Sequence, residues 1–467
     1  MSTDNRSAIA TSGTVPGAAG RATGTPANAA SAATVASPET EKSVATVSSA
    51  YDTLKKSESR SSLLTCRTLS AFLLFIVVNI AISYVVPHRA RVIDEAYIQS
   101  NGSEARQQGK WTWWITRNYL GRRRAPDIAT MGSSQMGSAT FSADAHTLNK
   151  VLDCVLHRSS STLEKALFDR TGKHVDTFNF SMGGSMASDA YMFSSALFKG
   201  DKKPRMVVIG VSPRDFIDNT LPSVSSTEPF TFFAPFVDMG DLSHVAFPDI
   251  LAEMNFFVKE NLPIERIHDA LDQMAKNYQN EAPSQMTAVP RASEHKSLLR
   301  AVLGSADEVR LNEWLIPATI PAWIFEDNTK EYLNRFRNCR PPIYKSEKAF
   351  FNAFLANMDA LGIPVLVVGM PSLAANRTIL PNDFWTEFRG DVASMCKAHN
   401  ARWVDHTDDA DFVLTDYLDT VHCNASGGTK IFNKIAEAIV ADPELGAVVK
   451  SAPARDNKLS DKPAATF

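Results

Sequence analysis

One short segment of the sequence combines an acid and a histidine at a spacing that suits catalysis. It reads Asp419-Thr-Val-His422-Cys-Asn424-Ala-Ser-Gly427 and places the aspartate three residues before the histidine. A serine hydrolase needs a histidine base that a carboxylate orients, and this spacing supplies both groups from one turn. The segment therefore predicts that Asp419 is the acid and His422 the base of a catalytic triad.

The matching nucleophile candidate is Ser134, which lies far upstream in the segment Met131-Gly132-Ser133-Ser134-Gln135. A turn that begins with glycine after a strand would expose the Ser134 hydroxyl at the edge of a sheet. The backbone N–H groups of Ser134 and Gly184 are the expected oxyanion donors, since Gly184 belongs to a glycine pair after another predicted strand. A Gly-Ser-Ser turn alone more often caps a helix, but the order Ser…Asp…His favours catalysis.

Three further residues are candidates for contacts with a substrate. Asn179 is expected to brace the loop that carries Gly184, and Asn424 lies where a helix is expected to begin. Arg214 could bind an anionic group such as a phosphate or carboxylate. The simpler interpretation of Arg214 is a surface ion pair with Asp215 or Asp218.

A second acid–histidine pair, Asp405-His406, directly follows a predicted strand. It lacks the Asn-x-x-Gly sequence that follows His422, so it ranks second as a catalytic pair. No CxxC motif or His/Cys cluster indicates a metal site, and no cofactor is expected. The net charge of −3 gives no reason to expect nucleic acid as a partner.

The elements that would position these residues alternate between strands and helices. Strands are predicted at residues 127–131, 175–180, 205–211, 364–369 and 401–405, and helices at 187–198, 346–361, 384–398 and 428–440. A further helical pattern covers residues 148–156. The alternation predicts a three-layer α/β/α fold with a mainly parallel sheet, whose sites gather at the carboxyl ends of the strands.

Residues 221–345 interrupt this alternation and are predicted to form a helical insertion within a domain that spans residues 126–445. The insertion begins with a phenylalanine-rich stretch: Phe230, Phe232, Phe233 and Phe236. These rings could cover the site or touch lipid, but packing on the core is favoured.

The two ends of the chain are expected to differ from this domain. Residues 1–62 are rich in Ala, Ser, Thr, Gly and Pro, and residues 446–467 look similar, so both are predicted to be disordered tails. Residues 63–87 contain an uncharged run from 69 to 86, which predicts one N-terminal transmembrane helix. The slight excess of basic residues before this run favours a cytoplasmic N-terminus and an extracytoplasmic main domain.

Residues 88–125 are predicted to be a membrane-proximal connector. Its three tryptophans, Trp111, Trp113 and Trp114, suit either the bilayer interface or packing against the domain. The cysteines do not indicate whether the protein lies in an oxidising or a reducing compartment. Cys66 lies at the predicted membrane boundary, and the other four can pair in three ways or pack as free thiols: Cys154, Cys339, Cys396 and Cys423.

Three motifs resemble sequence blocks of the SGNH (GDSL-like) hydrolase superfamily. Gly-Ser-Ser at 132–134, Asn-Phe-Ser-Met-Gly-Gly at 179–184 and Asp-x-x-His-x-Asn-x-x-Gly at 419–427 resemble its blocks I, II and V. The arrangement is most similar to the membrane-anchored branch with DltD-like, AlgJ-like and AlgX-like proteins. The resemblance implies an SGNH-hydrolase-like (flavodoxin-like) fold, with Ser134 as nucleophile, Gly184 as oxyanion glycine, Asp419 as acid and His422 as base.

The resemblance also implies an activity. A membrane-anchored, periplasmic or extracellular O-acyltransferase would modify a cell-envelope or secreted polysaccharide through a Ser-His-Asp acyl-enzyme. A membrane-bound O-acyltransferase partner would deliver the acyl group. An acyl esterase (deacetylase) of the same class uses the same groups and differs in the access of water. A third possibility is a non-catalytic scaffold of a polysaccharide modification or export complex.

One part of the sequence departs from the superfamily pattern. Block III, typically Gly-x-Asn-Asp, is expected after the strand that ends at Val211. The sequence there reads Gly210-Val-Ser212-Pro213-Arg214-Asp215 and has no asparagine to serve as a third oxyanion donor.

Overall fold

A computed structural model describes residues 67–79, 81, 93, 98, 111–261, 315–318 and 325–453. The predicted tail 1–62, most of the connector from 88 to 110, the middle of the insertion and the chain beyond 453 lie outside the described residues. The chain divides into two compact units, Met1–Val77 and Val78–Phe467, and each is considered by itself.

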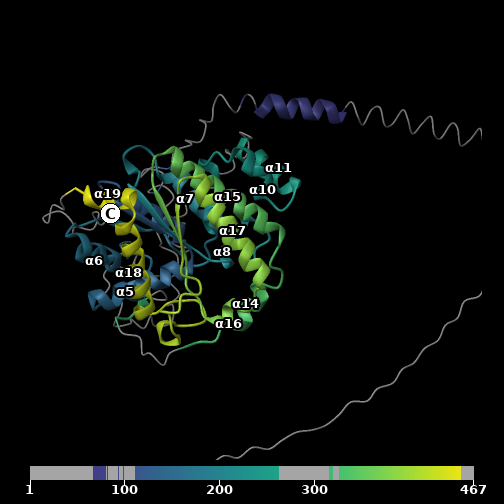
Figure 1. Cartoon of the computed structure of the whole chain (residues 1–467). Coiled ribbons are helices and arrows are strands. Elements are labelled where there is room, and N and C mark those ends of the chain that lie inside the picture. The colour runs from purple at the N-terminus through teal and green to yellow at the C-terminus, as the bar shows by residue number, and fades with distance from the viewer. Residues whose placement is uncertain are drawn as a thin grey trace, which may run out of the picture. The chain divides into compact units, whose positions relative to one another are not determined.

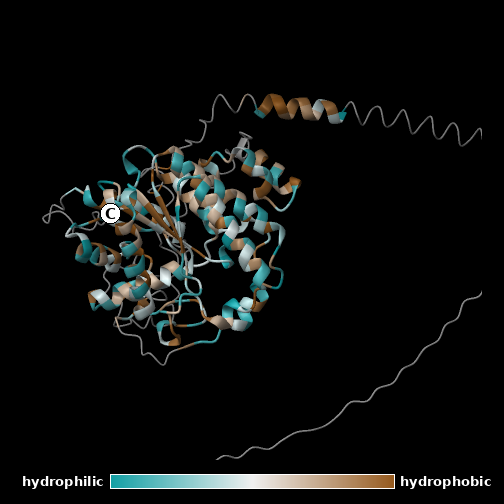
Figure 2. Cartoon of the chain, in the orientation of Figure 1, coloured by the Kyte–Doolittle hydropathy of each residue, from teal (hydrophilic) through white to brown (hydrophobic). Residues whose placement is uncertain are grey.

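Only part of the predicted transmembrane segment is described. Residues 67–79 and 81 are helical, and Figure 2 shows that this helix is mostly apolar. Leu69, Phe72, Leu73 and Leu74 expose between 53% and 64% of their surface. Within the described parts of the chain, no helix is both long and apolar enough to cross a membrane. The ends of segment 63–87 lie outside the described residues.

Five parallel strands form the central sheet in the order β3-β1-β4-β6-β7. They are β1 (Ile128–Met131), β3 (Thr177–Asn179), β4 (Met206–Val211), β6 (Val365–Gly369) and β7 (Arg402–Asp405). Every residue of β4 and β6 is buried, as expected for strands that helices cover on both faces. The predicted parallel sheet is confirmed, with strand ends that differ from the predicted ones by a few residues.

Helices cover both faces of this sheet, which is the three-layer arrangement (Figure 1). One layer contains α5 (Ser134–Leu148), α6 (Ser161–Thr171), α18 (Ala425–Ala441) and α19 (Pro443–Lys450). The other contains α7 (Ala187–Leu197), α8 (Arg214–Ile217), α15 (Pro342–Ala360) and α17 (Asn382–Ala398). Alternate strand residues enter two separate cores: Val208 packs under the first layer and Val207 under the second. Each such valine contributes about 1.5–3 kcal/mol of burial free energy.

The strand order explains where a site can form. The chain goes from β1 outward to β3, then returns past β1 to β4 and continues to β6 and β7. In open parallel sheets, ligands bind beyond the carboxyl ends of the strands where the order reverses. Ser134 follows β1 and residues 212–218 follow β4, so both segments lie at this reversal.

The first helix differs from its prediction. The sequence pattern placed a helix at 148–156, but α5 begins at Ser134 and ends at Leu148, and the predicted range contains a turn and β2 (Leu152–Asp153). The buried face of α5 contains small residues such as Ala139 and Ala143. It therefore has no stripe of large apolar side chains, which is the signal that the pattern search relies on.

Two helices extend across predicted domain boundaries. The connector was expected to reach residue 125, but α4 (Trp111–Leu120) packs in the core with Trp113 and Trp114 only 1% and 2% exposed. Packing against the domain is thus confirmed for these two rings. The C-terminal tail was expected from residue 446, but α19 continues to Lys450 because Leu445 and Val449 are buried against the first layer.

The start of the insertion packs on the core, whereas Ile250, Leu251 and Met254 further along it are exposed. Phe230, Phe233 and Phe236 are buried in the second core, which confirms the favoured interpretation for these rings. Residues 262–314 and 319–324 lie outside the described residues. The remaining described elements are β5 (Leu315–Ile316), α9 (Glu228–Phe233), α10 (Ser243–Ala246), α11 (Ile250–Asn261), α14 (Thr329–Arg335), α16 (Ala374–Arg377) and the 3₁₀ turns Gly200–Lys202, Val224–Ser226, Ala234–Phe236, Gly240–Leu242 and Leu414–Asp416.

Candidate active site

The structure brings the three predicted catalytic side chains into one hydrogen-bonded chain. The Ser134 hydroxyl oxygen lies 2.8 Å from His422 Nε2, although the two residues are 288 positions apart. His422 Nδ1 lies 2.6 Å from Asp419 Oδ2. An ionised carboxylate can only accept a hydrogen bond, so the Nδ1 atom carries the proton and Nε2 is left to accept the proton of Ser134. This is the geometry of a serine nucleophile with its base and orienting acid.

A tight turn fixes the acid. Asp419 Oδ1 accepts hydrogen bonds from the backbone N–H groups of Val421 and His422, both at 2.8 Å. Burial raises the pKa of Asp419, but the hydrogen bond with His422 and the two backbone bonds outweigh it and bring the pKa below its usual value. Asp419 is therefore ionised near neutral pH and can stabilise an imidazolium at His422.

The nucleophile turn depends on a glycine. Gly132 has a φ of 142°, and a Cβ atom there would lie 2.8 Å from the carbonyl oxygen of Gly210. Only glycine allows the chain to leave β1 in this way. Ser133 then becomes the N-cap and Ser134 the first residue of α5. The Ser134 N–H is one of the first N–H groups of the helix, which have no partner within it and lie at its positive end.

Close packing between α5 and α18 brings His422 to Ser134. A Cβ atom at Gly428 would lie 2.3 Å from the carbonyl oxygen of Ala139, so only glycine permits this approach of the two helices. The Ser138 hydroxyl donates to the carbonyl of Cys423 at 2.8 Å. Sequence reasoning missed Ser138, although it lies one helical turn after Ser134 and thus on the same side of α5.

Asn424 has a structural part in the same contact. Its Oδ1 caps α18 by accepting from the N–H groups of Ser426 and Gly427 at 2.9 and 3.3 Å. Its Nδ2 donates to the carbonyl of Thr415 at 2.7 Å. Both ends of the amide are therefore engaged, which corrects the prediction that Asn424 contacts substrate. The Asn-x-x-Gly sequence begins α18 and lets it approach α5.

The predicted oxyanion loop lies beside the nucleophile helix. A Cβ atom at Gly137 would lie 3.5 Å from the hydroxyl of Ser181, at the start of the loop. Gly184 has a φ of 81°, which favours glycine. Asn179 Oδ1 accepts from the N–H and the hydroxyl of Ser181 at 2.9 and 2.5 Å. Asn179 thus braces this loop as predicted, and it is completely buried, so it is not on a substrate surface.

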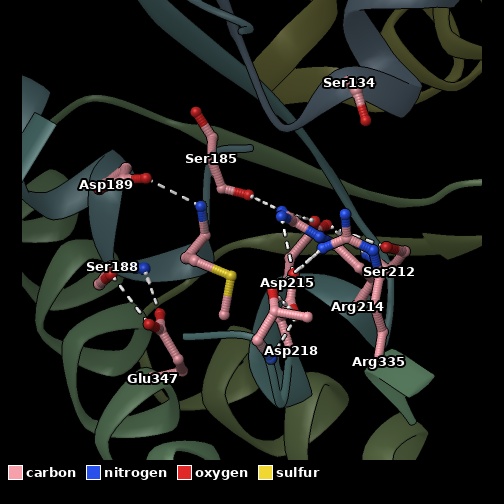
Figure 3. Close-up of polar contacts among 12 residues, drawn as sticks. Ser134, Ser185, Ser188, Asp189, Ser212, Arg214, Asp215, Asp218, Arg335 and Glu347 are labelled. Carbon is pink, nitrogen blue, oxygen red and sulfur yellow. Dashed lines mark hydrogen bonds and ion pairs between the residues drawn. The ribbon is translucent and has the colours of Figure 1, made fainter. Parts of the chain in front are cut away.

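Arg214 is bound to the protein itself. Its guanidinium pairs with Asp218 Oδ2 at 2.9 Å and donates to the Ser185 carbonyl at 2.5 Å (Figure 3). The Arg214–Asp218 ion pair is confirmed, but it is buried, whereas the sequence suggested a surface pair. Arg214 is therefore not free to bind an anionic substrate group, which corrects the substrate-binding prediction.

Several carboxyls lie buried around Arg214 (Figure 3). Burial raises the pKa of Asp189 to about 7 and the pKa of Asp215 to about 6. Hydrogen bonds and the positive charge of Arg214 lower both pKa values, but burial outweighs them. Burial and the nearby Asp189 raise the pKa of Glu347, which accepts from the Ser188 N–H at 2.7 Å. No local sequence pattern indicates this cluster, because its members come from α7, α8 and α15.

The second acid–histidine pair forms differently from its prediction. Asp405 accepts from the Thr407 N–H at 2.9 Å and pairs with Arg389 at 2.8 Å. His406 Nδ1 instead contacts Asp409 Oδ2 at 2.9 Å. His406 Nε2 is buried and has no hydrogen-bond partner within the described chain. This pair has no nucleophile, so the lower rank of Asp405-His406 is consistent with the structure.

The described residues contain no group of three potential metal ligands. The four cysteines among them, Cys154, Cys339, Cys396 and Cys423, are all free. Burial raises the pKa of Cys154 and Cys396 to about 12. These thiols therefore pack as small apolar side chains. Cys66 lies outside the described residues.

A pocket of about 390 Å³ opens near the catalytic turn. Its lining is polar and carries one aromatic ring: Ala374, Arg377, Thr378, Asn382, Trp385, Thr386, Arg389 and Asp408. None of Ser134, Asp419 and His422 lines this pocket. Leu373, which precedes the lining residue Ala374, donates its N–H to the Thr420 carbonyl of the catalytic turn at 2.9 Å. The volume is typical of ligand sites.

The sequence was compared with protein-family models and with curated proteins. No protein-family model matches the sequence, and no curated protein matches it significantly.

Proposed function

We propose that the protein is a membrane-anchored, extracytoplasmic O-acyltransferase of the SGNH type. It acts on a cell-envelope or secreted polysaccharide through an acyl-enzyme on Ser134. The observation that carries this proposal is the chain of hydrogen bonds from Ser134 through His422 to Asp419. The parallel sheet with its site at the strand reversal, and the motifs at 132–134, 179–184 and 419–427, support membership in that superfamily.

The first half of the reaction forms the acyl-enzyme. Ser134 Oγ attacks the carbonyl carbon of the donor ester while its proton moves to His422 Nε2, and a C–O bond forms. The negative charge on the carbonyl oxygen is held by the N–H groups of Ser134 and Gly184. The ester bond of the donor then breaks, and His422 returns the proton to the leaving oxygen. Asp419 stabilises the imidazolium in between.

The second half moves the acyl group to the acceptor. A sugar hydroxyl attacks the acyl-enzyme, gives its proton to His422, and the bond to Ser134 Oγ breaks as His422 reprotonates that oxygen. With water as the attacking group, the same steps give an acyl esterase. The pocket beside α16 supports an extended acceptor, because it offers polar side chains and the Trp385 ring near the catalytic turn.

The N-terminal segment supports the membrane part of the proposal. Its described helix exposes large apolar side chains such as Phe72 and Leu74, and exposed apolar surface of this kind is covered in a membrane. A tether to the bilayer raises the effective concentration of the domain near a membrane-borne acyl donor. The proposed partner is a multi-span membrane-bound O-acyltransferase that delivers the acyl group across the bilayer.

A non-catalytic scaffold is the second candidate. It is favoured by one observation: residues 212–215, which follow β4, contribute no asparagine to the oxyanion hole. A hole with two backbone donors stabilises the oxyanion less than one with three donors, since each donor is worth about 3 kcal/mol.

A serine-reactive fluorophosphonate probe tests the proposal. The purified external domain should be labelled, and Ser134→Ala should abolish the labelling without a change in melting temperature. Ser142→Ala is the matched control, since this buried serine lies on the same helix, α5, and its hydroxyl has no hydrogen-bond partner within the described chain. Products formed from a chromogenic acetyl ester with and without added oligosaccharide would separate transfer from hydrolysis. Wild-type protein without Ser134-dependent labelling would favour the scaffold.

A further inference from the structure

The turn that follows β4, residues 212–218, lies close to two segments of the site. Arg214 contacts the loop that contains Gly184, and Asp215 lies near Ser133. The turn closes on itself, since the Ser212 N–H and hydroxyl donate to Asp215 Oδ2 at 2.8 and 3.1 Å. Arg214 and Asp215 are thereby fixed as neighbours at the carboxyl end of β4. Their side chains are only 9% and 4% exposed. The turn supplies no amide side chain to the site, yet it is built from buried charged groups.

Arg214 reaches from this turn to the oxyanion loop. Its guanidinium donates to the carbonyl of Ser185, the residue after Gly184, at 2.5 Å (Figure 3). The Arg214 side chain is held by Asp218 Oδ2 at 2.9 Å, and Asp218 is completely buried. Arg335, at the end of α14, also bonds Asp218. Asp218 therefore binds both Arg214 and Arg335, and it connects the β4 turn to the end of the insertion.

Asp215 reaches in the other direction, towards the nucleophile. The Ser133 hydroxyl is among the groups that lower the pKa of Asp215, so it lies close to that carboxyl. Ser133 is the N-cap of α5 and precedes Ser134, but its side chain forms no capping bond to the helix. Asp215 therefore lies beside the N-cap residue of α5 and outside the helix.

The oxyanion loop, residues 181–186, is fixed at its ends and open in its middle. Arg158 donates to the Ser181 carbonyl at 3.1 Å, and the Met186 N–H donates to Asp189 Oδ2 at 2.8 Å. Within the described chain, the N–H groups of Gly183 and Gly184 donate to no acceptor. Two adjacent glycines give this loop wide backbone freedom. A fixed direction for the Gly184 N–H then requires a restraint close to it, and Arg214 provides one at the next residue.

We propose that Arg214 is a positioning residue of the oxyanion hole. It holds the Ser185 carbonyl so that the Gly184 N–H points at the oxygen that becomes negative during acyl transfer. The β4 turn thus orients the Gly184 donor in place of a third donor of its own. This inference rests on the proposed acyl-enzyme mechanism. It explains why a turn without an asparagine is packed with ion-paired side chains.

Two variants of Arg214 test the inference. Arg214→Met removes the hydrogen bond and the charge at similar length, and Arg214→Lys keeps the charge and restores part of the reach. The rate of fluorophosphonate labelling should fall by about 10- to 100-fold in Arg214→Met, less than the loss of a whole oxyanion donor. The lysine variant should recover part of that rate. The midpoint of the labelling rate against pH should stay the same, because the hydrogen bonds from Ser134 through His422 to Asp419 are retained.

Arg402→Met is the matched control. Arg402 also binds two carboxylates, Asp442 at 2.6 Å and Glu444 at 3.0 Å, but it lies at the amino end of β7, away from the site. Its labelling rate should equal that of the wild type. An equal loss in both variants at equal melting temperature would mean that Arg214 only stabilises the fold and would overturn the inference.

Hydrogen–deuterium exchange provides a readout that does not need activity. Peptides covering residues 181–186 should exchange faster in Arg214→Met than in wild type, and should be unchanged in Arg402→Met. Unchanged exchange in Arg214→Met would refute the positioning role. If wild-type protein is not labelled at all, the proposed function fails, whereas the exchange result still decides whether Arg214 orders the loop. Should Arg214→Met not fold, Arg214→Lys carries both measurements.

Discussion

Two histidine–aspartate pairs follow β7, and their local geometry is nearly the same. His422 Nδ1 lies 2.6 Å from Asp419, and His406 Nδ1 lies 2.9 Å from Asp409. Both pairs span three residues. They differ at the other ring nitrogen: His422 Nε2 contacts the Ser134 hydroxyl, whereas His406 Nε2 is buried without a partner in the described chain.

The carboxylates of the two pairs also differ in their other partners. Asp419 otherwise accepts only from backbone N–H groups of its own turn. Asp409 also pairs with Lys434 of α18 at 3.0 Å, so its charge helps to attach the loop to a helix. A histidine–aspartate spacing thus defines a local hydrogen bond, and distant packing decides whether that bond belongs to an active site.

The sharpest test of this comparison replaces each histidine in turn. His422→Ala should lower the turnover of a chromogenic acyl ester by about 10⁴- to 10⁶-fold, because the base for Ser134 is lost. His406→Ala should stay within about threefold of wild type, since no nucleophile contacts that ring. Steady-state kinetics on folded proteins would measure both. Comparable losses in the two variants would end the assignment of His422 as base.

Replacing each aspartate gives a smaller difference of the same kind. Asp419→Asn should lower turnover by about 10³- to 10⁴-fold, because an amide no longer selects the tautomer with the proton on Nδ1. Asp409→Asn should leave turnover unchanged and lower stability slightly by weakening the bond to Lys434. Turnover and thermal unfolding of the two variants would check this. Full activity of Asp419→Asn would show that the acid lies elsewhere.

A third test concerns the packing that selects one pair. Gly428→Ala places a methyl group against the Ala139 carbonyl, so α18 must move away from α5. We expect a loss of about 1–3 kcal/mol in unfolding free energy and about a 10²-fold loss in turnover, since a 1 Å shift of a catalytic group has that effect. Gly390→Ala is the control, because no atom lies within 4 Å of the added methyl in α17. Unaltered turnover in Gly428→Ala would show that the close contact between α18 and α5 is not needed for catalysis.

Much of the fold and the central site could be predicted from the sequence because local signals carry them. Continuous apolar runs such as 206–211 indicate buried parallel strands, and the Asp-x-x-His spacing closes a hydrogen-bonded turn by itself. The order of Ser134, Asp419 and His422 on an alternating β/α pattern then places them at the same edge of the sheet. The assignment to a superfamily and the membrane anchor stay predictions.

Other features of the site depend on contacts that no local pattern records. Arg214 suggested a ligand for anions, but its charge is used by Asp218 and Ser185, which lie on different segments. Asn424 looked like part of a motif for chemistry, but it caps a helix. The helix after Ser134 was missed, because it packs through small residues. In each case the partner is distant in sequence, so residue type alone could not identify the role.

Other groups that titrate near neutrality also affect how turnover depends on pH. Their contribution must be known before the pH profile is assigned to one of the two histidine pairs. Burial raises the pKa of Asp189 from 3.8 to about 7, despite hydrogen bonds from Thr227 and the Met186 N–H. The stability that this raised pKa contributes is complete below pH 4 and is lost as the pH rises towards 7. Asp189→Asn should therefore reduce the fall in melting temperature over this range, by about 2–4 °C for each kcal/mol recovered.

Asp409→Asn is the control for this last effect, because its carboxyl titrates in a different range. Burial raises the pKa of Asp409, but hydrogen bonds from the Asp411 N–H, Lys434 and His406 lower it to about 2 overall. Its contribution is lost only as the pH falls from about 4 to 2, so this variant should leave the slope between pH 4 and 7 unchanged. The pH midpoint of turnover should be the same in Asp189→Asn as in wild type. A shifted midpoint would mean that the buried Asp189 carboxyl contributes to the pH profile of turnover.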